Sequence, residues 1–175
     1  MRESLTITIP GSPPAELGKT RIHHWARKRA WDNAYELALL LWQDAVNVAL
    51  LRHARGLYVL PWSMVDITIT QFWCGTPLDR GNLIARCEAH TDAAQVEGGS
   101  RRWPKRGAGI IQHDGPDVVL SLTTAYERVA HRQDAAVRIT ITRRLPSAAA
   151  EIRGLVPDFT GELSTEEYLR ELRGN

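Results

Sequence analysis

The strongest periodic signal in the chain lies in residues 25–53, WARKRAWDNAYELALLLWQDAVNVALLRH. Apolar side chains recur there three and four positions apart, which is the spacing of one face of an α-helix. The segment therefore predicts one amphipathic helix that ends near Gly56. At about 1.5 Å per residue such a helix is roughly 40 Å long, enough to cross a whole sheet. The residues expected on its apolar face are Trp31, Ala34, Tyr35, Ala38, Leu41, Trp42, Ala45 and Val48.

Four segments around this helix alternate apolar and polar residues, as half-buried strands do. A second, shorter helix is expected at 82–96, and a glycine-bounded basic loop at 98–108. The order strand, helix, strand, helix, strand, strand predicts an α+β fold with a mixed four-stranded sheet backed by one long and one shorter helix. The four expected strands are 5–10, 65–73, 118–124 and 135–142.

Composition narrows the class of protein. The 175 residues are 43% hydrophobic and 24% charged, which is typical of a globular chain and excludes a disordered one. Gln43, Asp44 and Asn47 interrupt the longest apolar run, which argues against a membrane span, and the N-terminus lacks the apolar core of a secretory signal. Cys74 and Cys87 are too few for a disulfide framework, so a cytoplasmic location is expected.

Charge divides the chain near residue 145. Residues 146–175 carry six acidic residues against three arginines, a net charge of −3, so 1–145 carries +5 of the total of +2. We therefore expect one domain over 1–145 and an acidic C-terminal extension over 146–175. This extension should hold a short helix, because Ser164 and Glu167 form a capping-box pattern, and we expect that helix to dock on the domain or on a second subunit. The abundance of arginine over lysine fits either a GC-rich genome or bidentate contacts with phosphates.

Three places concentrate polar residues next to the expected strand ends. The first is 79–82, where Asp79 either caps the second helix or faces a ligand. The second is 109–117, GIIQHDGPD, which is either an ordinary turn or part of a site. The third is a cationic patch before the long helix, made of Lys19, Arg21, His23 and His24.

The second helix places two acids on one polar stripe. At about 100° per residue, Glu88 and Asp92 share a side with Gly81. Positions 81 and 92 are about 16 Å apart along the axis, so Asp92 is a poor candidate to share an ion with Asp79. Glu88 would share an ion with Asp79 only with a long reach.

The order of these motifs resembles the RusA-like Holliday junction resolvases, especially the phage and prophage members from GC-rich bacteria. Their N-x-R-x-H segment before a long helix is similar to KTRIH at 19–23, and their D-x-D-N-L motif to DRGNL at 79–83. Asp92 stands ten residues after Asn82, where the family tends to have an Asp. A later G-V-[IL] and D-D-S/D-P segment is similar to 109–119, and the last strand to 137–141. The resemblance covers about residues 5–145.

The resemblance implies a homodimeric, Mg²⁺-dependent endonuclease that nicks four-way junctions or related branched DNA. It implies that Asp79 and Asp114 lie at neighbouring strand ends and hold the ion, which activates water for attack on a phosphodiester. We also expect Asp92 to be a third metal ligand, and Asn82 and Glu88 to belong to the catalytic set. The implied DNA contacts, with Trp103 stacking on an unpaired base, are Lys19, Arg21, His23, His24, Arg86, Arg101, Arg102, Trp103, Lys105 and Arg106.

Three positions depart from the family pattern. Gly81 replaces the second Asp of D-x-D-N, Glu88 stands at the position of a family Lys, and His113 replaces the first Asp of the D-D pair. These departures leave open a DNA-binding relative that has lost cleavage. A small α+β interaction protein without nucleic acid is the other alternative. Salt-dependent junction binding separates the first two hypotheses from the third, and Mg²⁺-dependent nicking separates the nuclease from its inactive relative.

Overall fold

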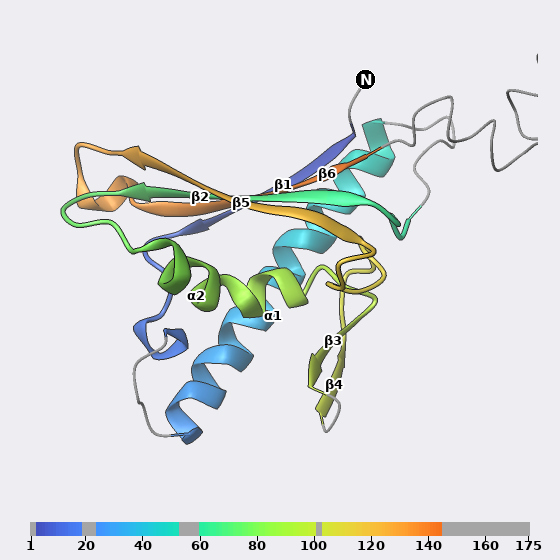
Figure 1. Cartoon of the computed structure of the whole chain (residues 1–175), viewed down its shortest axis with the longest axis horizontal. Helices are drawn as coiled ribbons and strands as arrows, with labels where there is room; N and C mark the ends of the chain where they lie inside the picture. Colours follow the sequence, from blue (N-terminus) through green and yellow to red (C-terminus); the bar gives the residue numbers. More distant parts are fainter. Residues whose placement is uncertain (1–2, 19–23, 53–59, 101–102, 145–175) are drawn as a thin grey trace, which may run out of the picture. The chain divides into compact units, whose positions relative to one another are not determined.

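The computed structural model describes residues 3–18, 24–52, 60–100 and 103–144 (Figure 1). The chain divides into two units, Met1–Arg144 and Leu145–Asn175. The second unit, with the helix expected after Ser164, lies outside the described residues. The elements of the first unit are β1 (Ser4–Pro10), the 3₁₀ turn η1 (Ala15–Leu17), α1 (His24–Arg52), β2 (Val65–Trp73), α2 (Arg80–Asp92), β3 (Glu97–Ser100), β4 (Trp103–Arg106), β5 (Val119–Arg128), the 3₁₀ turn η2 (Arg132–Asp134) and β6 (Ala136–Arg143).

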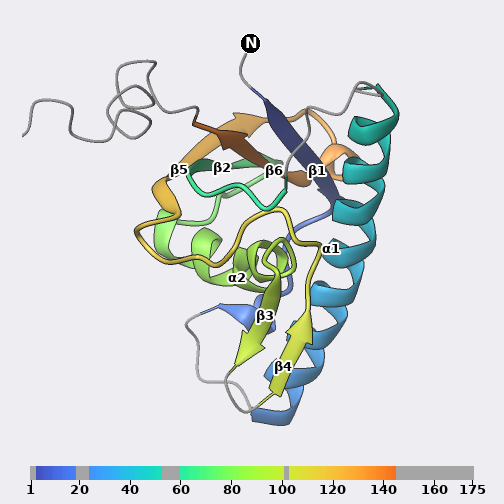
Figure 2. The same cartoon turned by 90° about the vertical axis from the view of Figure 1, so that its right-hand side faces the viewer.

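The main sheet has four strands in the order β1-β6-β2-β5. β6 pairs antiparallel with both β1 and β2, whereas β2 and β5 are parallel. A parallel pair needs a long crossover, and here α2 and the β3–β4 hairpin form it. Both helices lie on the same face of the sheet (Figures 1 and 2). The expected α+β fold with a mixed four-stranded sheet and two helices is therefore confirmed.

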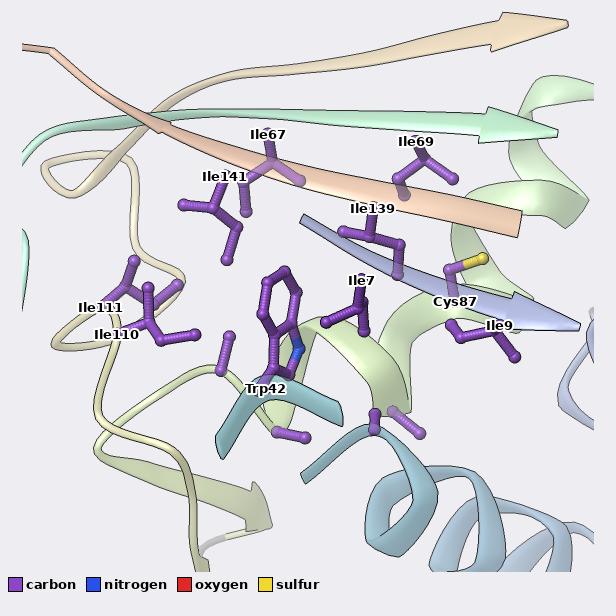
Figure 3. Close-up of a cluster of buried hydrophobic side chains, with 14 of the residues drawn as sticks. Ile7, Ile9, Trp42, Ile67, Ile69, Cys87, Ile110, Ile111, Ile139 and Ile141 are labelled. Carbon is purple, nitrogen blue, oxygen red and sulfur yellow. The ribbon is translucent and has the colours of Figure 1, made fainter. Parts of the chain in front are cut away.

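The core lies between the helices and the sheet. Alternate residues of β1, β2 and β6 are buried. In the strand register, Ile7 and Ile69 both lie beside Ile139. Trp42 of α1 is fully buried in the same cluster, with Ile7 close to its ring (Figure 3). Its indole N–H donates a hydrogen bond of 2.9 Å to the carbonyl oxygen of His90, which ties α1 to α2. This hydrogen bond and the buried α2 residues Leu83, Cys87 and Ala89 hold the helix under the sheet.

The segment expected to be a basic loop at 98–108 instead contains a two-stranded antiparallel sheet, β3 with β4. The sequence pattern does not predict these strands, because they contain glycines and Pro104, and neither residue type favours a strand. Two of the glycines are required by close approach: a Cβ at Gly107 would overlap the carbonyl of Gln95, and one at Gly98 would lie 2.6 Å from the Tyr35 hydroxyl. The hairpin is thus built against α1 and the end of α2.

The second helix ends at Asp92 instead of residue 96, and it begins two residues earlier than expected. Backbone hydrogen bonds explain the early end. The carbonyls of Ala93 and Ala94 accept from the amides of Ala108 and Ile110, both at 2.8 Å, so the chain leaves the helix to pair with the segment before β5. β5 itself runs four residues beyond the predicted end at 124.

By length and composition alone, Trp25–Leu51 of α1 is long and apolar enough to cross a membrane. The polar residues within this segment were the reason not to expect a span. In the structure, Tyr35, Ala38 and Trp42 on one face of α1 are buried against the sheet. One such helix is weak evidence for a membrane span, because a buried core helix and a signal sequence both meet the same length and composition.

Candidate acidic site

Asp79 lies at the N-terminus of α2 and caps the helix. Its Oδ1 accepts a hydrogen bond of 3.0 Å from the backbone N–H of Asn82, and its Oδ2 accepts another from the side-chain amide of the same residue. An Asp at this position satisfies an amide that has no partner within the helix and carries a charge that the helix dipole favours. Of the two roles left open for Asp79, the geometry supports the cap.

The other acids meet at the opposite end of α2. Glu88 and Asp92, one helical turn apart, and Asp114 from the segment before β5 line one cavity of about 280 Å³. The polar stripe expected on α2 thus faces this cavity. Its walls are apolar and come from α2, from the parallel strands β2 and β5 and from the segment before β5: Ile67, Ile69, Ile84, Ala85, Ile111, Val119 and Leu122, with Thr91 beside the acids.

The cavity makes the negative charge of Asp92 unfavourable. Burial, and then the negative charges of Glu88 and Asp114, raise the pKa of Asp92 from an ordinary value of 3.8 to about 7. The Gln95 side-chain amide donates one hydrogen bond of 3.1 Å to Asp92 Oδ1. A bound proton or a bound cation would each relieve the mutual repulsion of the three carboxylates.

This arrangement corrects the expectation that Asp79 and Asp114 lie at neighbouring strand ends. Asp79 follows the C-terminal end of β2, whereas Asp114 precedes the N-terminal end of the parallel strand β5, so the two acids lie at opposite ends of this strand pair. Asp92, which lines the cavity together with Asp114, is 13 residues from Asp79, about 20 Å along α2. One ion in a single chain therefore cannot contact both. Asn82 stays with Asp79, whereas Glu88 joins Asp92 and Asp114. The spacing of Glu88 and Asp92 on one helix face was the sequence signal for their grouping.

The donor chemistry of the cavity suits a hard divalent cation, because Mg²⁺ prefers carboxylate oxygens. The carboxylates are not gathered into a finished ligand set: among the described residues, no group of three or more His, Cys, Asp or Glu side chains is placed to hold a metal ion. A cation bound by Glu88, Asp92 and Asp114 requires side-chain rotation within the cavity.

His113 turns toward its own loop instead of the cavity. Its Nδ1 accepts a 3.0 Å hydrogen bond from the backbone N–H of Gly115, and its Nε2 lies 3.4 Å from Asp117 Oδ2. The position where the family has the first Asp of its D-D pair therefore contributes to a turn, and Asp114 is the member of that pair that lines the cavity.

Lys105, expected to contact DNA, holds the hairpin to α1. Its Nζ lies 2.8 Å from Asp32 Oδ1 and 5.5 and 5.2 Å from the ring centroids of Trp31 and Tyr35. The hydrogen bond with Lys105 is the main reason that the pKa of Asp32 is lowered. This lysine is therefore already neutralised by a carboxylate and stacked on two rings, an arrangement that the sequence did not indicate.

The other residues predicted to contact DNA differ in exposure, and the structure describes only some of them. Arg106 is exposed on β4. Arg86 on α2 packs against Gly18, and its Nε is buried with no hydrogen-bond partner among the described residues. The side chains of His24 and Trp103 are not described. Lys19, Arg21, His23, Arg101 and Arg102 lie outside the described residues.

Together, the fold and the cavity define a small α+β domain with an acidic cavity beside a parallel strand pair. No family model matches the chain, and no curated protein matches it significantly. Its function is therefore inferred from the residues themselves.

Proposed function

We propose that this chain is a Mg²⁺-dependent endonuclease of the RusA-like type, cytoplasmic and homodimeric, that nicks four-way junctions or related branched DNA. The observation that carries the proposal is the convergence of Glu88, Asp92 and Asp114 on one cavity. Two of these, Asp92 and Asp114, stand at positions that the motif resemblance assigns to acids, although they are 22 residues apart in the sequence.

The roles of the chain's own residues follow from their positions. Glu88, Asp92 and Asp114 would hold the ion, which when bound supplies a Lewis acid for attack on a phosphodiester. Asp92 is partly buried, which strengthens the attraction of its carboxylate for a cation, whereas Glu88 and Asp114 are exposed and can reach the ion from solvent. Asp79 and Asn82 contribute by fixing the start of α2, because this helix carries two of the three acids. Arg106 on the hairpin, which is exposed, is available for a DNA phosphate.

A nicking assay tests the proposal with a matched pair of variants. Labelled four-way junction and linear duplex are incubated with the protein in Mg²⁺ and in EDTA. Asp114→Asn should lose nicking by at least about a hundredfold while it still binds junctions. Asp117→Asn is the control, because Asp117 lies three residues away in the same turn but outside the cavity. If the two variants cleave equally well, the metal site is misplaced.

A second candidate function is junction binding without cleavage. It is favoured by Gly81 in the D-x-D-N position and by the lack of a ready three-ligand group among the described residues. Salt-dependent junction binding without nicking at any Mg²⁺ concentration would select this candidate. No binding to junctions at any salt concentration would favour an interaction module instead.

A further inference from the structure

β5 is the outermost strand on one side of the described sheet, and it lacks the residues that commonly protect an edge strand. Among the described strands, β5 pairs with β2 alone. Residues 119–126, VLSLTTAY, contain no charged residue, no glycine and no proline. Natural edge strands commonly carry charges or proline, which prevent pairing with another chain. The register with β2 is regular from Ser121 to Arg128, so this stretch offers a regular edge to one more strand.

The backbone groups on this edge can be assigned from the pairing with β2. In a parallel pair, both backbone groups of one residue point to the same neighbouring strand, and those of the next residue point away from it. The N–H of Val129 donates a 2.8 Å hydrogen bond to the carbonyl oxygen of Trp73, so the odd-numbered residues pair with β2. The residues that point to the outer edge are therefore Leu122, Thr124 and Tyr126. The Arg80 side chain confirms this direction, because its Nη2 donates a 3.3 Å hydrogen bond to the Leu122 carbonyl oxygen.

The acidic cavity lies beside this edge. Val119 and Leu122 of β5 line it together with the three acids. On α2, His90 is fully buried on the side of Trp42 of α1, whereas Glu88, about 160° away around the helix axis, is exposed. α1 and β1 lie on one side of the domain and β5 on the other (Figure 2). The acids of α2 therefore face the β5 side.

We propose that the outer edge of β5 binds an extended segment of a partner protein, and that a basic side chain of this segment enters the acidic cavity. The added strand lies about 4.8 Å beyond β5 and pairs with Leu122, Thr124 and Tyr126. Its side chains on the face of α2 lie next to Leu122, whose own side chain lines the cavity. A lysine or arginine there meets the exposed carboxylates of Glu88 and Asp114.

Charge distinguishes this partner from other occupants of the edge. The chain's own residues 146–175 carry a net charge of −3, which disfavours their approach to three acids. A second copy paired through β5 would bring a second set of the same acids beside the first. A basic segment instead gains from all three carboxylates. Leu120 and Tyr126, exposed by 42 and 40%, add apolar contact at the two ends of the stretch.

Pairing at the β5 edge goes beyond the proposed nuclease activity and does not require it. Its consequence for nicking does rest on the proposed function. A basic side chain among the three acids competes with Mg²⁺ for the same carboxylates, so the bound segment inhibits nicking.

Fluorescence anisotropy of the full chain in EDTA, without DNA, tests the pairing. The probe is a labelled ten-residue peptide of alternating valine and threonine with one central arginine, and its matched control has glutamate in place of the arginine. The arginine peptide should bind with a Kd of roughly 10–100 µM, at least tenfold tighter than the glutamate peptide. N-methylation of one alternate set of peptide amides should abolish binding, whereas N-methylation of the other set should not, because only one set faces β5.

Variants of the protein locate the binding site. Thr124→Pro removes an N–H on the outer edge and no hydrogen bond to β2, a position at which strands tolerate proline. It should weaken binding of the arginine peptide at least tenfold, whereas Thr124→Val, which keeps the amide, should stay within twofold. Glu88→Gln should weaken the arginine peptide about fivefold and should not weaken the glutamate peptide. Circular dichroism confirms that each variant is folded, and the methylated peptides decide the matter on the unchanged protein if Thr124→Pro is not.

Four results would each overturn the proposal. They are equal affinity for the arginine and glutamate peptides, equal binding of the two methylated peptides, equal binding by Thr124→Pro and Thr124→Val, and no binding of the arginine peptide at about 1 mM. Because these measurements contain no DNA and no Mg²⁺, they are independent of the nicking assay. In that assay the arginine peptide should raise the Mg²⁺ concentration needed for nicking. A peptide that binds at β5 and leaves nicking unchanged would support the edge pairing and refute the placement of Mg²⁺ in the cavity.

Discussion

Replacing Asp92 by Asn should stabilise the domain at high pH while removing a ligand from the acidic cavity. The folded protein raises the pKa of Asp92 from 3.8 to about 7, through burial and the charges of Glu88 and Asp114. In the unfolded chain this carboxyl loses its proton near pH 4. The folded protein thus binds this proton more tightly than the unfolded chain does. The resulting contribution to the free energy of unfolding is fully present below about pH 4, and it is lost as the pH rises to about 7.

The magnitude follows from the same two values. A tenfold change in proton affinity is worth about 1.4 kcal/mol, so the difference between 3.8 and about 7 corresponds to roughly 4 kcal/mol. The cavity is open to solvent and its carboxylates repel one another less in water, which reduces the expected effect to about 2 kcal/mol. Asn keeps the shape of a protonated Asp and retains an oxygen for the Gln95 amide, whose hydrogen bond to Asp92 is 3.1 Å long.

Thermal unfolding measured between pH 4 and pH 8 tests this prediction. The melting temperature of Asp92→Asn should exceed that of the unchanged protein by about 4–8 °C at pH 8, and the difference should vanish toward pH 4. Asp117→Asn, outside the cavity, is the control and should show no such trend. Millimolar Mg²⁺ should raise the melting temperature of the unchanged protein at pH 8 and leave that of Asp92→Asn unaffected. A difference between the two proteins that is the same at pH 5 and pH 8 would refute this account of Asp92.

Three further substitutions probe the contacts that position the site. Asp79→Ala should cost about 1 kcal/mol of stability by removing the α2 cap and should leave Mg²⁺ binding, followed by calorimetry, within twofold; loss of binding would contradict the cap assignment. Lys105→Met should accelerate amide hydrogen exchange across β3 and β4, because the ammonium contact with Asp32 and the two rings is lost; unchanged exchange would show that other contacts hold the hairpin. Trp42→Phe should cost about 2 kcal/mol in urea unfolding, because it leaves the buried His90 carbonyl without its donor and opens a void; a cost below about 0.5 kcal/mol would show that the core adapts.

The strands and the long helix were predictable because their patterns are local. The alternation of Leu5, Ile7 and Ile9 marks β1, and the helical spacing around Trp42 marks α1 almost to the residue. The hairpin was missed because its strands contain Gly98, Gly99 and Pro104, and it depends on contacts with α1 instead of its own propensity. Local pattern thus predicted the elements that supply the core, but not the element that only docks on it.

The composition of the acidic site was partly predictable, but its geometry was not. Glu88 and Asp92 share a face of one helix, so their proximity follows from the spacing of the sequence alone. Asp114 lies beside them because the crossover between the parallel strands brings the start of β5 to the C-terminal end of α2. No local pattern shows which end of a helix a later loop will meet, and the expectation that Asp79 would meet Asp114 failed for this reason.

The two ends of α2 hold their carboxylates under opposite conditions, and this contrast indicates where a cation would bind. At the N-terminus, Asp79 accepts hydrogen bonds from Asn82 and lies where the helix dipole favours a negative charge, so a cation there would compete with contacts already made. At the C-terminus, Asp92 is partly buried, faces two other acids and lies where the dipole disfavours a negative charge. Structural needs alone would favour an amide or an apolar residue at position 92. An ionised carboxylate at position 92 lowers the stability of the domain unless a cation or a proton is bound. Functional sites commonly lower the stability of a protein in this way.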